Sequence, residues 1–116
     1  MEFESSQSIF SQIAESLSEK ILKQQYEVGE KIPSVRELAA EVGVNPVTIM
    51  RTFNELQSKG IIENKRGIGY FVTEKAIDLI RNEKKAVFFE KVLPDFIHQS
   101  ELLGISKEEL KSHLNL

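Results

Sequence analysis

Residues 32–72 read IPSVRELAAEVGVNPVTIMRTFNELQSKGIIENKRGIGYFV, and this stretch decides the fold of the chain. Near its start, Ser34 and Glu37 have the spacing of a capping box, in which each side chain accepts a hydrogen bond from the other residue's backbone amide. The apolar residues that follow recur on one face of a helix: Val35, Leu38, Ala39 and Val42. Gly43 permits the sharp turn that ends a helix. These signals predict a helix over residues 35–42.

A second helix is predicted to begin almost at once. Asn45 is a preferred N-cap, and Pro46 suits the first helical position. The face expected to be buried holds Ile49, Phe53 and Leu56. At about 100° per residue, the opposite face holds Val47, Arg51 and Asn54. Gly60 closes this helix. Two helices joined by about three residues that include a glycine are typical of a helix-turn-helix.

A short hairpin is predicted to follow the second helix. Residues 61–63 and 70–72 are apolar enough to form strands on either side of the polar stretch 64–69. That stretch contains two glycines and the adjacent cations Lys65 and Arg66. The sequence therefore predicts a hairpin with a basic tip, which is the wing of a winged helix.

Amphipathic helices are predicted on both sides of this module. Before it, apolar residues recur every four positions: Ile9, Ile13, Leu17 and Ile21. After it, a helical pattern resumes at Glu74 with Thr73 as the expected N-cap. Pro94 is expected to kink or divide this helix, because proline lacks an amide hydrogen and clashes with the preceding turn. Ser106 and Glu109 form a second capping box, which opens a last short helix.

These patterns divide the chain into a winged helix-turn-helix domain, residues 1–73, and a short helical dimerisation segment, residues 74–116. The fold class is mainly α with a small β wing. The second part holds more apolar side chains than one helix hides alone, and those expected at a dimer interface are Phe88, Phe89, Val92, Leu93, Phe96 and Ile97. Packing within the same subunit is the alternative. A homodimer with two-fold symmetry places two reading heads on one duplex.

The composition excludes several classes of protein. The chain has 116 residues, a net charge of −3 and no cysteine. Residues 31–75 are the one positive third, with seven basic and five acidic side chains. No signal-peptide pattern opens the sequence and no apolar run approaches the roughly 20 residues of a membrane span, so we expect a cytoplasmic protein. The catalytic motifs of common enzymes are missing. With two histidines and no cysteine, we expect neither a metal site nor a cofactor.

Residues 8–73 closely resemble the DNA-binding module of the GntR family. The shared motifs, in order, are P-S-x-R-E-L-A, the G-V turn, N-P-x-T, the E-L-x-x-x-G ending and the G-x-G wing. The C-terminal part is similar to the YtrA subfamily, in which a small helical segment mediates dimerisation. The resemblance implies a bacterial transcriptional regulator, usually a repressor, that binds a palindromic operator in double-stranded DNA. Pro46 and Met50 stand where many members have basic residues, so no operator sequence follows. A winged-helix adaptor for protein–protein contact is the alternative.

The candidate DNA contacts lie on the two helices and the wing: Ser34, Arg36, Asn45, Pro46, Val47, Thr48, Arg51, Asn54, Lys65, Arg66, Gly67 and Gly69. Arg51, on the outward face, is placed to read guanine in the major groove. Thr48, at the start of the second helix, is placed to contact a phosphate. For Arg36, a salt bridge with Glu37 or Glu41 competes with contact to DNA.

The wing residues also have two interpretations. Lys65 and Arg66 could protect an edge strand from pairing with another chain. Because Gly67 and Gly69 allow a close approach to a backbone, contact with phosphate or with the minor groove is the preferred interpretation.

Overall fold

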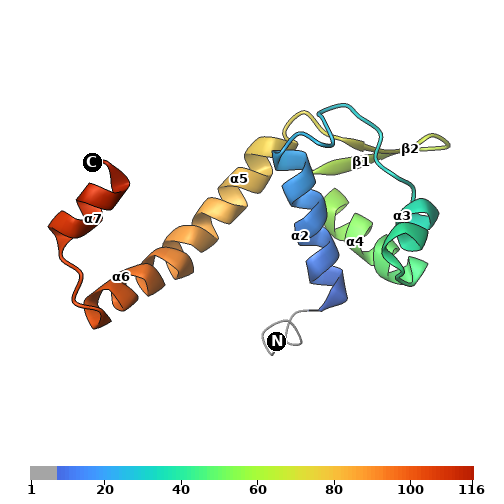
Figure 1. Cartoon of the computed structure of the whole chain (residues 1–116). Helices are drawn as coiled ribbons and strands as arrows, with labels where there is room; N and C mark the ends of the chain where they lie inside the picture. The colour runs from blue at the N-terminus through green and yellow to red at the C-terminus, as the bar shows by residue number, and fades with distance from the viewer. Residues whose placement is uncertain (1–7) are drawn as a thin grey trace. The chain divides into compact units, whose positions relative to one another are not determined.

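The computed structural model describes residues 8–116, which form helices and one hairpin (Figure 1). In chain order these are helices α2 (Ile9–Leu22), α3 (Val35–Val42) and α4 (Pro46–Ser58), strands β1 (Ile62–Lys65) and β2 (Gly69–Val72), helix α5 (Ala76–Val87), the π-helical turn η1 (Phe88–Val92), and helices α6 (Leu93–Leu102) and α7 (Lys107–Leu114). The chain forms two compact units, one through Arg81 and one over Asn82–Leu116. Within residues 8–116, no helix is both long enough and apolar enough to cross a membrane.

The start and the end of α3 are fixed by its own sequence, as predicted. Ser34 Oγ accepts a hydrogen bond from the Glu37 amide at 3.1 Å, and the Ser34 amide donates to Glu37 Oε1 at 2.9 Å. Gly43, at φ 71°, adopts the left-handed conformation that glycine tolerates best, and its amide donates to the Ala39 carbonyl. The predicted bounds of residues 35–42 are therefore confirmed.

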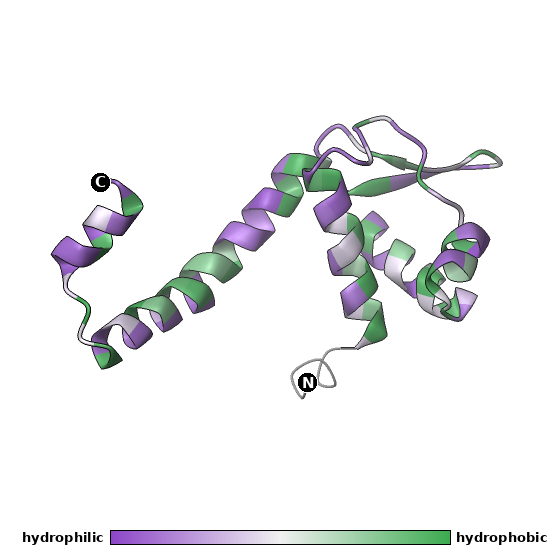
Figure 2. Cartoon of the chain, in the orientation of Figure 1, coloured by the Kyte–Doolittle hydropathy of each residue, from purple (hydrophilic) through white to green (hydrophobic). Residues whose placement is uncertain are grey.

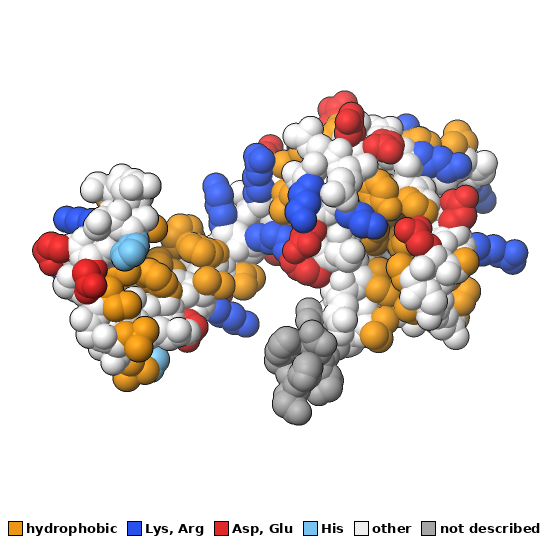
Figure 3. All heavy atoms as spheres, in the orientation of Figure 1, with side chains coloured by type: hydrophobic (Ala, Val, Ile, Leu, Met, Phe, Trp, Pro, Cys, Tyr) orange, Lys and Arg blue, Asp and Glu red, His pale blue; other side chains and the backbone are white. Residues whose placement is uncertain are grey.

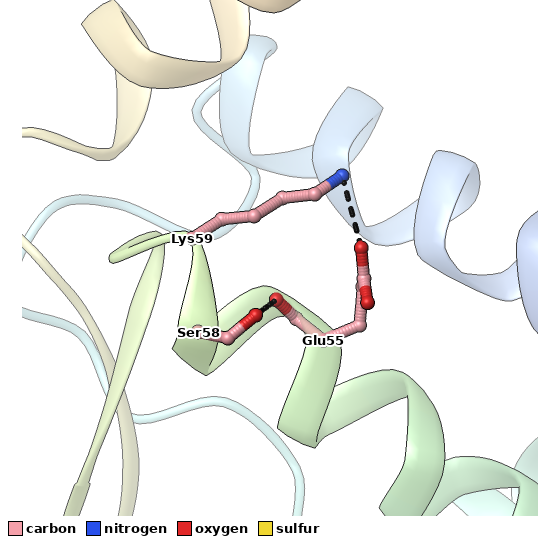
Figure 4. A network of polar contacts seen from close by, with 3 residues as sticks. All are labelled: Glu55, Ser58 and Lys59. Carbon is pink, nitrogen blue, oxygen red and sulfur yellow. Dashed lines mark hydrogen bonds and ion pairs between the residues drawn. The ribbon is translucent and has the colours of Figure 1, made fainter.

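Helix α4 also begins where the sequence predicts. Asn45 Oδ1 accepts from the Val47 amide at 2.8 Å, and Pro46 is the first helical residue. At the other end, Ser58 Oγ donates to the Glu55 carbonyl at 2.8 Å, and Lys59 Nζ lies 3.5 Å from Glu55 Oε2 (Figure 4). The Lys59 and Glu55 side chains are 38% and 43% exposed, so their ion pair contributes only about 0–1 kcal/mol. The hairpin follows directly.

The hairpin is longer than the sequence predicts and has a third segment beside it. Antiparallel pairing runs from Ile62 opposite Val72 to Lys65 opposite Gly69, so the loop between the strands is short. On the other edge of β2, Lys31 forms an isolated antiparallel bridge with Phe71. Residues 29–32 therefore pair with the edge of β2, which was not predicted.

The core of the first unit lies where α2, α3 and α4 meet the hairpin and the start of α5. It is lined by Ile13, Leu17, Ile21, Ile32, Leu38, Ala39, Ile49, Phe53, Leu56, Ile61, Ile62, Val72, Ala76 and Ile80. Burying each of the larger side chains stabilises the fold by about 1.5–3 kcal/mol. Because Ala76 and Ile80 belong to this core, the first unit continues beyond Thr73 to Arg81.

Thr73 does not cap α5, and that prediction was wrong. Its hydroxyl donates instead to the carbonyls of Gly60, at 2.6 Å, and Ile61, at 3.1 Å. The helix begins at Ala76, after a turn in which the Ala76 amide donates to the Thr73 carbonyl. The competing acceptors come from the end of α4, which is distant in sequence.

The second unit contains a proline within an otherwise helical stretch. Pro94 lies in the first turn of α6, directly after the π-helical turn, and Leu93 donates its amide to the Phe88 carbonyl across that turn. The widened turn falls where proline removes a hydrogen bond and conflicts with the preceding turn. The prediction was that Pro94 kinks or divides the helix; the structure shows a π-helical turn instead, with the backbone still helical at Val92 and Leu93. The capping box of Ser106 and Glu109 is present at the start of α7.

Large apolar side chains remain exposed on the second unit. Hydrophobic residues gather along η1 and α6 (Figure 2), and hydrophobic side chains cover much of this unit's visible surface (Figure 3). Phe89 is 61% exposed and Phe88 is 46% exposed, and their rings pack edge to face at 5.3 Å. Val92, Phe96 and Ile97 are also exposed, whereas Leu93 is half-buried.

Candidate nucleic-acid interface

Helix α4 presents one exposed face and one buried face. Its buried face holds Ile49, Thr52, Phe53 and Leu56. On the opposite face, Val47 is 74% exposed, and Arg51 and Asn54 are also exposed. At about 100° per residue these three side chains fall in one stripe. The helix therefore offers a continuous surface of mixed chemistry, with one aliphatic group, one cation and one amide.

The first turn of α4 adds polar groups to this surface. Asn45 and Pro46 are exposed, and Thr48 is half-buried. The Asn45 side chain satisfies the Val47 amide, and the Thr48 amide donates to the Asn45 carbonyl at 2.9 Å. The positive end of the helix dipole lies here, which favours a negatively charged group in front of this turn.

Arg51 makes a contact that the sequence did not predict. Its guanidinium carbon lies 4.4 Å from the centre of the Phe10 ring, in the first turn of α2. Arg51 is exposed, so its N–H groups can still donate to an acceptor while the guanidinium contacts the ring. Phe10 was not among the predicted site residues. No signal within one helix relates it to Arg51.

The start of α3 contributes a hydroxyl and a cation. Ser34 is half-buried as the N-cap, and Arg36 is exposed. In the part of the chain that the structure describes, Arg36 makes no ion pair with Glu37 or Glu41. The Ser34 backbone amide, followed by the Ser34 hydroxyl and the charge of Lys31, lowers the pKa of Glu37 below its ordinary value of 4.5. Glu37 is thus engaged in capping, and Arg36 remains available to a ligand.

The wing carries the remaining candidate residues. Lys65, Arg66 and Gly67 are exposed, and Gly67 adopts a left-handed conformation at φ 78°. Lys65 Nζ lies 4.5 Å from the centre of the Phe71 ring. Gly69 is half-buried and has φ 144°, a backbone conformation that favours glycine. Two cations and an open glycine backbone therefore meet at the tip.

The wing is attached to α4 by one aromatic side chain. The Tyr70 ring packs edge to face against Phe53, with ring centres 4.8 Å apart, and its hydroxyl donates to Met50 Sδ at 3.9 Å. These contacts bring the wing and the exposed face of α4 into one structural unit. This role of Tyr70 was not predicted, although the two-residue period that buries Val72 also turns Tyr70 towards the core.

The charged members of the candidate set are all cations. They include the cations Arg36, Arg51, Lys65 and Arg66 and no carboxylate. Basic and acidic side chains are interspersed over the rest of this unit (Figure 3). Among residues 8–116, no group of three or more histidine, cysteine, aspartate or glutamate side chains is placed to hold a metal ion. The arrangement suits binding of a polyanion by a helix face and a basic loop.

Known proteins share both the sequence and the fold. A family model described as "Bacterial regulatory proteins, gntR family" matches residues 10–72. The HTH-type transcriptional regulator YhcF of Bacillus subtilis is 41% identical over 109 residues, which cover 94% of this chain and 88% of YhcF. The HTH-type transcriptional repressor YtrA of the same organism is 36% identical over 106 residues, covering 91% and 81%.

Solved structures give the same result. A GntR family transcriptional regulator from Listeria monocytogenes superposes with a TM-score of 0.75 at 35% identity, covering 95% of each chain. AraR(DBD) in complex with operator ORR3 superposes with a TM-score of 0.54 at 31% identity, covering 55% of this chain and 77% of that one. These relatives are transcriptional regulators and not enzymes.

Proposed function

Because the chain belongs to the gntR family of bacterial regulatory proteins and is a DNA-binding transcriptional regulator, we propose that it represses transcription as a homodimer on a palindromic operator. We place this activity in the cytoplasm, where a bacterial operator lies. The named repressor YtrA, which is 36% identical, supports the sign of regulation. The likeness to a domain in complex with an operator supports the same ligand.

The observation that carries the proposal is the exposed face of α4. Val47, Arg51 and Asn54 project from a helix whose other face is locked in the core. An arginine can donate two hydrogen bonds to guanine, and an aliphatic group can contact a thymine methyl. A helix held rigidly from behind keeps such groups in a fixed register on the major groove. Arg36 and the wing cations supply contacts that do not depend on sequence.

The exposed apolar side chains of the second unit support the homodimer. Phe88, Phe89, Val92, Phe96 and Ile97 all remain about half exposed in the single chain. Contiguous apolar surface of this kind is characteristic of a protein–protein interface. A two-fold interface requires a patch that is complementary to itself, and two identical heads then bind half-sites about one helical turn apart.

Selection of bound duplexes from a random pool tests the operator. We expect an inverted repeat whose half-site centres lie about 10 base pairs apart, or a multiple of that. A gel shift with the selected duplex and a random duplex, at low and high salt, measures specificity. Enrichment of a single unrepeated half-site would contradict the palindrome. A protein that shifts neither duplex at low salt would act as an adaptor between proteins instead.

Repression and dimerisation need separate measurements. A reporter gene with the selected operator across its promoter should be transcribed less when the protein is present. Higher transcription would contradict the proposed repression but not the proposed DNA binding. Sedimentation of the full chain should give the mass of two copies, whereas a single-chain mass at micromolar concentration would contradict the homodimer.

A further inference from the structure

A third cation reaches the wing from a part of the chain far from it in sequence. Lys31 pairs with Phe71 on the free edge of β2. Backbone hydrogen bonds flank this bridge, from the Gly29 amide to the Val72 carbonyl at 2.8 Å and from the Ile32 amide to the Tyr70 carbonyl at 2.9 Å. Lys31 is therefore held beside β2 by the backbone hydrogen bonds of its neighbours.

Strand alternation places Lys31 on the outer face of this sheet. Side chains alternate between the two faces of a strand, and Ile32, Ile62 and Val72 are buried on the core side. Lys31 and Phe71 consequently point the other way. Two features of the wing lie on this same outer face: the ammonium of Lys65 over the Phe71 ring, and the side of Gly69 where a Cβ atom would project.

The side chain of Lys31 runs across Gly69. A Cβ atom on Gly69 would lie 2.7 Å from Lys31 Cε and 3.6 Å from both Cδ and Nζ, so an alanine would push the lysine aside. Gly69 is the first residue of β2 and adjoins the tip of the wing. We expected this glycine to leave space for the DNA backbone. That space is instead occupied by the Lys31 side chain, whose ammonium lies beside the tip.

The Lys31 ammonium is exposed and is not neutralised by a direct partner. Within residues 8–116, Lys31 forms no ion pair, and Glu63 on the same face forms none with either lysine. The charge of Lys31 also acts on Glu37 at the start of α3. Lys31 therefore lies between the wing and the helix start that carries Arg36, and both are candidate DNA contacts.

We propose that Lys31 is a DNA phosphate contact of the wing and that Gly69 serves to hold its side chain there. This inference rests on the proposed DNA binding. An ammonium is a compact charge that suits a phosphate rather than a planar base edge. Lys31 contributes affinity that does not depend on sequence, and it extends the basic surface from the hairpin tip to the start of α3.

The salt dependence of binding tests this role in the full chain. Fluorescence anisotropy would measure affinity for the selected operator and for a random duplex at several salt concentrations. For Lys31→Gln we expect the slope of log K against log salt to become less steep by about 1.8, because the homodimer loses one phosphate contact per subunit and each contact accounts for about 0.9. Lys31→Arg should restore the slope, and the preferred bases should not change. Lys75→Gln removes an exposed charge from the same unit and should leave the slope unaltered.

A slope for Lys31→Gln equal to that of the unaltered protein would overturn the proposal. Failure of the unaltered protein to bind either duplex would instead contradict the proposed function. Gly69→Ala tests the holding role. As a single substitution it should make the slope less steep, and when it is combined with Lys31→Gln it should cause no further change. If Gly69→Ala lowers the slope equally in both backgrounds, Gly69 contacts DNA itself and does not act through Lys31.

Discussion

The contact between Arg51 and the Phe10 ring leads to a prediction about operator affinity. The direction of the change in affinity shows whether Arg51 stays on the ring when DNA binds. If Arg51 reads its base while it stays on the ring, the ring holds the guanidinium in the binding geometry before DNA arrives. Phe10→Leu would then weaken operator binding, because a leucine fills space but lacks the aromatic face. If Arg51 must leave the ring to reach DNA, the same substitution would strengthen binding. We expect weakening, because Arg51 is exposed and its N–H groups can donate to a base while the guanidinium keeps its contact with the ring.

The size of the effect follows from the contact. The guanidinium carbon lies 4.4 Å from the Phe10 ring centre, and Arg51 is exposed. A cation–π contact at an exposed site is worth about 0.5–1 kcal/mol. Since 1.4 kcal/mol corresponds to a factor of ten, Phe10→Leu should weaken binding roughly two- to fivefold per half-site, and should raise the Kd of the dimer on both half-sites roughly five- to 30-fold. Arg51→Ala should cost more, about 1–3 kcal/mol, because it removes the base contact itself.

A double-mutant cycle on the operator and on random DNA measures this coupling. Phe10→Leu should have no effect once Arg51 is alanine, and little effect on random DNA in either background. Tyr26→Leu is the matched control, because it removes the ring beneath Lys20, a similar contact elsewhere on the same unit. Tighter binding by Phe10→Leu, or an equal loss in both Arg51 backgrounds, would refute the reasoning. Thermal unfolding of each variant separates lost contact from lost fold.

Three further predictions concern the dimer, the core and the cap. Phe88→Asp should give a single-chain mass in sedimentation, because it places a carboxylate on the apolar surface, whereas Lys85→Asp should remain a dimer. If both variants sediment as dimers, Phe88 packs within its own subunit and not at the interface. Phe53→Ala should lower the free energy of unfolding by about 3–5 kcal/mol in urea titration, because Phe53 is fully buried, and a loss below 1 kcal/mol (roughly an exposed site) would contradict its place in the core. The folded-state pKa of Glu37 lies below its ordinary value of 4.5. The Glu37 carboxylate therefore contributes fully to stability at a pH above 4.5, and this contribution is lost as the pH falls through the folded-state pKa. Glu37→Gln should therefore unfold more easily at neutral pH and match the unaltered protein in strong acid, and a constant difference at every pH would contradict the capping role.

Local signals in the sequence predicted most of the fold. The capping box at Ser34, the turn at Gly43 and the N-cap at Asn45 each depend on residues within four positions of one another. Such interactions are present in the sequence pattern itself, so the helices before the wing could be placed closely. A disturbance of the C-terminal helix near Pro94 was predictable for the same reason, because the missing amide belongs to that residue alone.

Interactions between distant residues were not predictable in this way. Thr73 has the residue type of an N-cap and precedes a helical pattern, yet its hydroxyl donates to the Gly60 and Ile61 carbonyls once the hairpin has returned the chain to them. Lys31 lies beside β2 only after the whole helix-turn-helix has formed. For the candidate site, the sequence supplied the residues, and the fold supplied the neighbours that hold them. Their contacts with DNA stay predictions.

The π-helical turn has a consequence for how this segment tolerates a change of length. Phe88 and Phe96 are eight positions apart, so an uninterrupted α-helix would place them about 80° apart around its axis. A π-helical turn absorbs one extra residue, and each residue accounts for about 100° of rotation. The turn over Phe88–Val92 thus returns Phe88 to within about 20° of Phe96. It does the same for Phe89 and Ile97. A chain with one residue deleted here could form a plain α-helix and keep the same apolar stripe.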